Sequence, residues 1–126
     1  WRGEPYPVGP RFGETWFTVE RAAAEFLGVR AYGVHLNGYV ARADGPHLWI
    51  PRRTLDRPTY PGKLDNTVAG GQPAGLTVME NLVKEAEEEA SIPAALARRA
   101  VPVGADELKR ELEGMIAALR KPPAAA

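Results

Sequence analysis

Three glutamates are the residues of this sequence best suited to chemistry. Glu85, Glu88 and Glu89 are spaced i, i+3 and i+4, so on an α-helix their side chains fall within about 100° of arc. Like charges at this spacing repel each other, and a divalent cation would reverse the sign of that interaction. Carboxylate oxygens are hard ligands that suit Mg²⁺ or Mn²⁺. On spacing alone, a solvated glutamate-rich helix face is the commoner explanation.

A helix that begins at Thr77 is expected to carry these glutamates. Thr77 and Glu80 have the spacing of a capping box, and the pair Ile92-Pro93 ends the helix, with a short second helix through Arg99. Apolar residues recur on one face of the first helix: Met79, Leu82, Val83, Ala86 and Ala90. A loop-rich segment with a short strand around residues 66–68 precedes this helix.

The remaining elements follow from local patterns. Residues 1–17 are expected to form an extended arm. A short helix with Thr18 as its N-cap ends at Gly28, and residues 31–51 form a β-hairpin with its turn at 43–45. His35 falls in the first hairpin strand and is expected to be a core histidine. Residues 105–121 form an amphipathic helix, and residues 122–126 a disordered tail.

Composition excludes several functional classes. The 126 residues suit one domain, and 16 basic residues balance 16 acidic ones, so neither nucleic acid nor an acidic membrane is an expected partner. There is no cysteine, and no apolar stretch long enough to span a bilayer. We therefore expect a cytoplasmic protein. The balance hides a net charge of −4 over residues 80–89 and of +3 over residues 49–63.

The run over residues 69–92 resembles the Nudix box, a loop–helix–loop motif written G-x5-E-x7-R-E-U-x-E-E-x-G-U, where U is aliphatic. Gly70 takes the first glycine, residues 84–89 take R-E-U-x-E-E, and Ile92 takes the last aliphatic position. All three glutamates of the E-x-x-E-E pattern are present. Three positions depart from the motif, where Glu, Arg and Gly are replaced in turn: Leu76, Lys84 and Ser91.

A narrower resemblance covers residues 12–104. The chain looks like the Nudix subgroup of thiamine pyrophosphokinase-associated and plant plastid proteins, in which a hydrophobic residue at the Leu76 position and the ending Glu-Glu-Ala-Ser-Ile-Pro are normal. The stretches that carry this resemblance are 31–40, 48–53, 58–65, 68–71, 80–82 and 85–93. It implies a Nudix-like domain over 18–104, with its box at 70–92, folded as an α/β/α sandwich around a mixed sheet.

The resemblance also implies an activity, the Mg²⁺-dependent hydrolysis of a diphosphate linkage in a small molecule. The substrate would be thiamine diphosphate or an oxidised derivative, and the product a monophosphate. Glu85, Glu88 and Glu89 would hold one to three Mg²⁺ or Mn²⁺ ions, and either Glu88 or Glu89 could instead be the general base. The Gly70 carbonyl would be a further metal ligand.

The resemblance leaves substrate contacts to glycine backbone and two arginines. Gly70 and Gly71 would let the backbone approach the phosphates closely, with Gly71 as the substrate-binding one, although for these glycines alone a plain tight turn is the commoner explanation. Arg52 and Arg53 are neighbours at the end of a strand and point to opposite faces, so one of them is expected to reach a phosphate. For Asp65 a structural hydrogen bond is the favoured role. Four aromatic residues could stack on a substrate ring, although each is more often a core residue: Tyr32, Tyr39, Trp49 and Tyr60.

The resemblance stops after residue 104, where the subgroup normally continues with further strands. We therefore expect a fragment or a shortened variant, with an exposed sheet edge unless the 105–121 helix or a second subunit covers it. The alternative function is a catalytically weak binding or oligomerisation module, which could form a homodimer through the C-terminal helix or the exposed edge. Isoprenoid diphosphate isomerisation is a distant option, because it normally needs a cysteine and this sequence has none.

Overall fold

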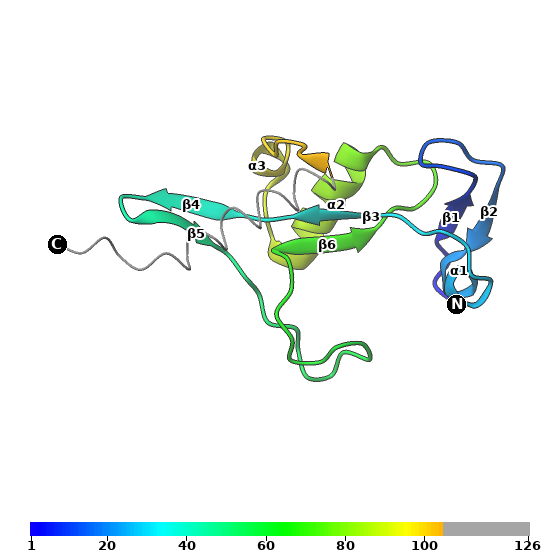
Figure 1. The fold of residues 1–126 in the computed structure, drawn as a ribbon, viewed down its shortest axis with the longest axis horizontal. Helices are drawn as coiled ribbons and strands as arrows, with labels where there is room; N and C mark the ends of the chain where they lie inside the picture. Colours follow the sequence, from blue (N-terminus) through cyan, green and yellow to red (C-terminus); the bar gives the residue numbers. More distant parts are fainter. Residues whose placement is uncertain (105–126) are drawn as a thin grey trace, which may run out of the picture.

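The computed structural model describes residues 1–104 of the chain, and the predicted helix over 105–121 and tail over 122–126 lie outside them. The described part is an elongated α/β structure, in which a central strand pair and the helices packed on it lie between two outlying strand pairs, one of which carries a further short helix (Figure 1). Its elements, in chain order, are β1 (Pro5–Val8), β2 (Phe17–Glu20), α1 (Arg21–Phe26), β3 (Gly33–Leu36), β4 (Tyr39–Arg42), β5 (Gly45–Leu48), β6 (Val68–Gly71), α2 (Val78–Ala90) and α3 (Ala94–Ala97). No helix of residues 1–104 is long and apolar enough to cross a membrane.

The strands form three separate two-stranded sheets. β1 pairs with β2, β3 with β6, and β4 with β5, and all three pairings within residues 1–104 are antiparallel. The α/β class predicted from the sequence is confirmed, but the mixed sheet is not present in these residues. A mixed sheet needs a parallel pair, and here each strand is only four residues long and finds a single antiparallel partner.

The N-terminal region differs from the expected arm. β1 lies within it and pairs with β2, with Tyr6 opposite Val19. Because β2 takes up residues 17–20, Thr18 is a strand residue and the N-cap of α1 is Glu20, whose carboxylate accepts from the amide of Ala22 at 3.3 Å. The predicted N-cap was therefore wrong by two residues. Gly28, with φ +64°, follows α1 as predicted.

The predicted hairpin is confirmed in its outer half only. β4 and β5 pair around the turn at 43–44, with Tyr39 opposite Leu48. β3, which comes before Asn37-Gly38, pairs instead with β6, so that Gly33 lies opposite Gly71 and Val34 opposite Gly70. This long-range pair places the Gly70-Gly71 backbone beside the first half of the expected hairpin.

The core lies between β6, α2 and α3. Val68, Ala86 and Ala97 are buried against one another, and three partly buried side chains pack around them: Leu36, Val83 and Ile92. α2 contacts β3, β6 and α3, so the glutamate-bearing helix is fixed directly on the central strand pair (Figure 1). The strand pair and α2 therefore form the platform of the site.

Candidate metal centre

The helix that carries the glutamates is capped at both ends. Thr77 Oγ1 accepts from the amide of Glu80 at 3.2 Å, and the Thr77 amide donates to Glu80 Oε2 at 2.8 Å, which completes the predicted capping box. These hydrogen bonds from Thr77 lower the pKa of the Glu80 carboxyl. At the other end Ser91 takes a left-handed conformation with φ +52°, and its amide donates to Glu87 O at 3.1 Å. Ser91 thus occupies the position at which the motif has glycine, and it adopts a conformation that favours glycine.

Glu85 is the central member of the carboxylate patch, which consists of Glu85, Glu88 and Glu89. Its side chain is 14% exposed and lies directly over Gly70, where a Cβ atom would overlap the Glu85 carboxylate. A side chain at this point of β6 would force either Glu85 or the strand to shift. The sequence predicted that Gly70 allows a close approach of the backbone, and the group that makes this approach in the structure is Glu85.

Lys84 connects two members of the carboxylate patch. Its Nζ lies 3.3 Å from Glu85 Oε1 and 3.1 Å from Glu88 Oε2. The hydrogen bond to Glu88 raises the pKa of the Lys84 ammonium. Lys84, which stands where the motif has arginine, is therefore a cation shared by two carboxylates. A single positive charge already sits where a divalent cation would be attracted.

Glu89 binds the edge of β6. The amide of Gln72 donates to Tyr32 O at 2.9 Å, so the alternation of an antiparallel ladder places Gly70 in a hydrogen-bonded pair with Val34 and turns the Ala69 amide outward. Glu89 Oε2 accepts from that outward amide at 3.0 Å. The same alternation points the Gly70 carbonyl toward β3.

Asn81 binds the next outward group of β6. Its Nδ2 donates to Gly71 O at 2.9 Å and to Gln72 Oε1 at 3.2 Å, while its buried Oδ1 has no partner among the described residues. Together with Glu89, Asn81 therefore binds backbone groups on the side of β6 that faces away from β3. On that side, the edge of the strand pair is bonded by α2 side chains.

The three carboxylates share a face of α2 but point to three different neighbours, which are Gly70, Lys84 and the Ala69 amide. In this arrangement no three His, Asp or Glu side chains of residues 1–104 converge as a metal site. The donor set nevertheless fits a hard divalent cation, because it consists of carboxylate oxygens and two of them already share the Lys84 ammonium. Rotation of Lys84 and Glu89 away from their present partners would free three ligands on one patch.

The two predicted substrate-binding arginines lie in the basic loop, defined as residues 52–65. Arg53 Nη1 donates to Asp65 Oδ2 at 2.7 Å and its Nε to Thr59 O at 3.1 Å, while Arg52 Nη1 donates to Gly62 O at 3.1 Å. Arg53 lowers the pKa of the Asp65 carboxyl. Both guanidinium groups therefore bind the loop itself, and the expected structural hydrogen bond of Asp65 is present.

Two cavities lie near Glu89 and its partner Ala69. The turn cavity, of about 480 Å³, lies between the basic loop and Ala69 and is lined by Arg53, Thr59, Tyr60, Lys63, Leu64, Asp65 and Ala69. A larger apolar groove, of about 850 Å³, includes Tyr39, Trp49 and Glu89 in its lining. Glu89 lines the groove directly, and it accepts a hydrogen bond from the amide of Ala69, which lines the turn cavity.

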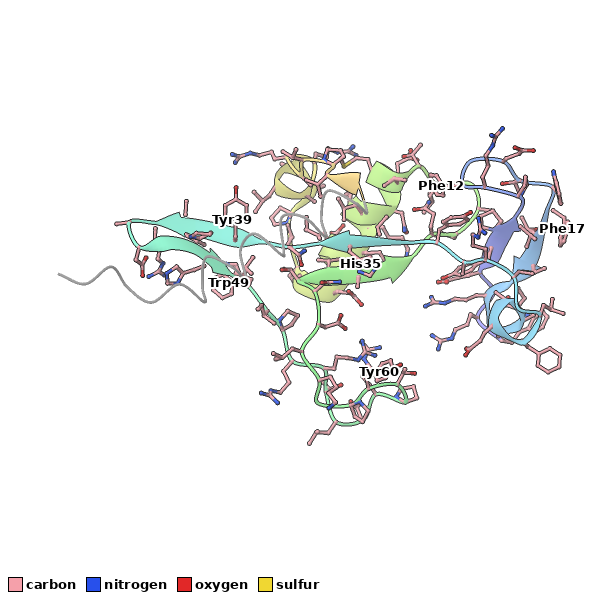
Figure 2. The ribbon with its side chains drawn as sticks, in the orientation of Figure 1. Phe12, Phe17, His35, Tyr39, Trp49 and Tyr60 are labelled. Atoms are coloured by element: carbon pink, nitrogen blue, oxygen red, sulfur yellow. The ribbon has the colours of Figure 1, made fainter. Side chains whose placement is uncertain are left out.

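Several aromatic and histidine expectations need correction. His35 is exposed, and its Nδ1 accepts from Asn66 Nδ2 at 2.6 Å, so it is not a core residue. Tyr39, Trp49 and Tyr60 are also exposed (Figure 2). Tyr32 is the partly buried one of the four and meets Phe12 edge to face, with ring centroids 5.1 Å apart.

Sequence reasoning missed Tyr6, which lies against the second glycine of β6. Its hydroxyl occupies the space of a Cβ atom at Gly71, and Arg21 sits 5.6 Å from the ring centroid while pairing with Glu4 at 2.8 Å. Burial raises the pKa of the Tyr6 hydroxyl. In the sequence, Tyr6 is a single tyrosine in a Pro- and Gly-rich stretch. Its contact with Gly71 depends on how β1 meets the end of β6, so no local pattern predicts it.

The chain with this glutamate helix is homologous to Nudix hydrolases. It is 55% identical over 104 residues to Nudix hydrolase 24, chloroplastic, and 54% identical over 105 residues to Nudix hydrolase 20, chloroplastic, both of Arabidopsis thaliana. Each match covers 82% of this chain and 28% of the plant protein. An uncharacterized protein of Saccharomyces cerevisiae is 39% identical over 94 residues, which is 73% of this chain and 27% of that protein. No protein-family model matches the chain.

Proposed function

We propose that this chain carries the metal-binding part of a Nudix-type hydrolase that cleaves a diphosphate linkage. The observation that supports this most is the carboxylate patch on α2, with Glu85 over Gly70, in a chain homologous to two Nudix hydrolases. The chain spans little more than a quarter of the length of those relatives. For this chain, the substrate and the activity are therefore proposals.

Glu85, Glu88 and Glu89 would hold Mg²⁺ or Mn²⁺. The Gly70 carbonyl, which the resemblance implied as a further ligand, points toward β3 and away from these carboxylates, so it is not placed to join them. When bound, the cation neutralises the diphosphate and lowers the pKa of bound water. Glu85 suits a fixed ligand because its side chain is 14% exposed, against 58% for that of Glu88. Lys84 would keep these two carboxylates in place between binding events.

Glu88 and Glu89 are the candidates for proton transfer. Glu88 is open to solvent water, while Glu89 must first leave the Ala69 amide. Either carboxylate would accept the proton of an attacking water and hold it at an Oε atom. The basic loop would draw the anionic diphosphate toward the patch, since it contributes Arg53 and Lys63 to the cavity beside Ala69.

The proposed substrate is thiamine diphosphate or an oxidised derivative, and the product the monophosphate. This rests on the subgroup resemblance. A panel of thiamine diphosphate, ADP-ribose and nucleoside diphosphates, assayed for phosphate release with and without Mg²⁺, tests both the reaction and the substrate.

Glu88→Gln is expected to reduce the Mg²⁺-dependent rate by about 10²-fold or more, because it removes a candidate ligand and base. Glu87→Gln is the matched control. It makes the same change one residue away, at an exposed position about 100° around the helix from Glu88, and should leave the rate within about twofold. A parent chain that is inert toward every substrate, or equal effects of both variants, would contradict the proposal and favour the alternative of a catalytically weak binding module.

A further inference from the structure

The basic loop ends in a tight turn that its own arginines hold in place. Tyr60, Pro61, Gly62 and Lys63 form this turn, and the Lys63 amide donates to Tyr60 O at 3.4 Å. Proline at the second position and a glycine with φ +69° at the third are the pattern of a type II turn. The turn also pairs with the opposite side of the loop, since Arg53 N donates to Lys63 O at 2.8 Å and Gly62 N to Arg53 O at 3.1 Å.

Both arginine side chains reinforce this turn. Arg52 binds the Gly62 carbonyl, and Arg53 binds the Thr59 carbonyl and Asp65. The Arg53 side chain is 28% exposed, and its Nε and Nη1 groups both donate hydrogen bonds within the loop. These contacts make the arginines positioning residues for the turn.

Tyr60 and Lys63 are the first and last residues of the turn, and both line the turn cavity. Among residues 1–104, no ion pair involves Lys63, whereas Arg53 is paired with Asp65. Tyr60 is 72% exposed and takes a left-handed backbone conformation with φ +50°. A non-glycine residue in that region carries a conformational cost, and such strain concentrates at ligand sites. Figure 2 shows Tyr60 on the loop that projects away from β6.

We propose that this turn is the recognition element for a diphosphate that carries an aromatic heterocycle, with Lys63 contacting the phosphates and Tyr60 stacking on the ring. The inference rests on the proposed function for the reaction but names its own contacts. A lysine ammonium donates strong, charge-assisted hydrogen bonds to phosphate oxygens, and a tyrosine ring stacks on flat or cationic rings. Ala69, in the wall of the same cavity, connects this site to Glu89.

Direct binding tests the inference without turnover. The probes are inorganic pyrophosphate and thiamine diphosphate, titrated into the metal-free chain by calorimetry. Lys63→Ala should weaken both probes by about tenfold. Tyr60→Ala should weaken thiamine diphosphate by about threefold to tenfold and leave pyrophosphate unchanged. Arg57→Ala is the matched control, because it removes a cation of the same loop that does not line the cavity, and both probes should bind it as they bind the parent.

Equal affinities of parent and Lys63→Ala for both probes would overturn the proposal, and so would a parent that binds neither probe. Equal losses for both probes in Tyr60→Ala would overturn the role of the ring, since stacking cannot act on pyrophosphate. The failure of hydrolysis with this binding pattern intact would count against the proposed function alone. In an active chain, Lys63→Ala should raise KM about tenfold with little change in kcat, which a merely structural role would not produce.

Discussion

Gly70→Ala is expected to disturb the carboxylate patch from the opposite side of the contact. A Cβ atom at Gly70 would fall inside van der Waals contact of Cγ, Cδ and Oε2 of Glu85. The backbone of Gly70 is not in the left-handed region, so alanine suits its conformation and the cost is steric. Either β6 shifts or Glu85 leaves its place beside Lys84.

The magnitude follows from the packing. Forcing one extra carbon into a well-packed position costs about 1 to 3 kcal/mol, and Glu85, at 14% exposed, has little free space into which to move. If Glu85 moves out of the carboxylate patch, metal binding must bring it back against this steric cost, and the binding free energy falls by the same amount. This predicts a weakening of Mn²⁺ affinity by about 5- to 150-fold.

A double-mutant cycle in urea measures this contact. Gly70→Ala should lower the free energy of unfolding by about 1 to 3 kcal/mol in the parent, and by less than about 0.5 kcal/mol in a Glu85→Ala background. Gly38→Ala is the control, because the nearest atom to its new Cβ is Thr67 Cγ2 at 3.4 Å, an ordinary contact. Equal costs of Gly70→Ala in both backgrounds would refute the contact and the reasoning built on it.

Two further predictions concern stability. Ser91→Gly should raise the free energy of unfolding by about 1 kcal/mol, and Tm by several degrees, because it removes the side chain from a residue with φ +52°. Ala90→Gly, one residue earlier and inside α2, should lower the free energy of unfolding by about 1 kcal/mol. A thermal melt in which both changes destabilise the chain would contradict this prediction. The lowered pKa of Asp65 means that its pair with Arg53 contributes stability above its ordinary pKa of 3.8 and loses it as the pH falls through the folded value. Asp65→Asn should therefore lose less stability than the parent on acidification below pH 3.8, and parallel stability curves in urea titrations across that range would refute the role of the pair.

The parts of the fold that the sequence predicts best are those set by neighbouring residues. Thr77 and Glu80 are three residues apart, so their capping box needs no tertiary information. The turn between β4 and β5 and the end of α2 at Ser91 are local in the same way. Thr18 shows the limit, because its pairing with β1 overrides a helix-capping preference.

His35 shows a different kind of error. Val34 and Leu36 alternate with it in β3, and strand side chains alternate between faces. With Val34 buried, His35 had to lie on the opposite, exposed face. The alternation in β3 therefore predicts an exposed His35, and the prediction of a core histidine was wrong because it did not use this alternation.

The shared helix face of the three glutamates was predictable from the sequence, but their contacts were not. The spacing of Glu85, Glu88 and Glu89 places them on one face of a helix, as the structure has them. The packing of Glu85 on Gly70, the Glu89 bond to Ala69 and the burial of Tyr6 against Gly71 all join segments distant in sequence. Such contacts depend on the pairing of β3 with β6, which no local pattern encodes.

The most direct test of the metal centre is a Mn²⁺ titration followed by electron paramagnetic resonance, which requires no substrate. The parent chain and Glu87→Gln should bind Mn²⁺ with the same affinity. Glu88→Gln and Glu85→Gln should each weaken binding by about tenfold or more, the equivalent of about 1.4 kcal/mol. Equal Mn²⁺ affinity in all four proteins, or no binding to the parent, would contradict the assignment of Glu85, Glu88 and Glu89 as a metal centre.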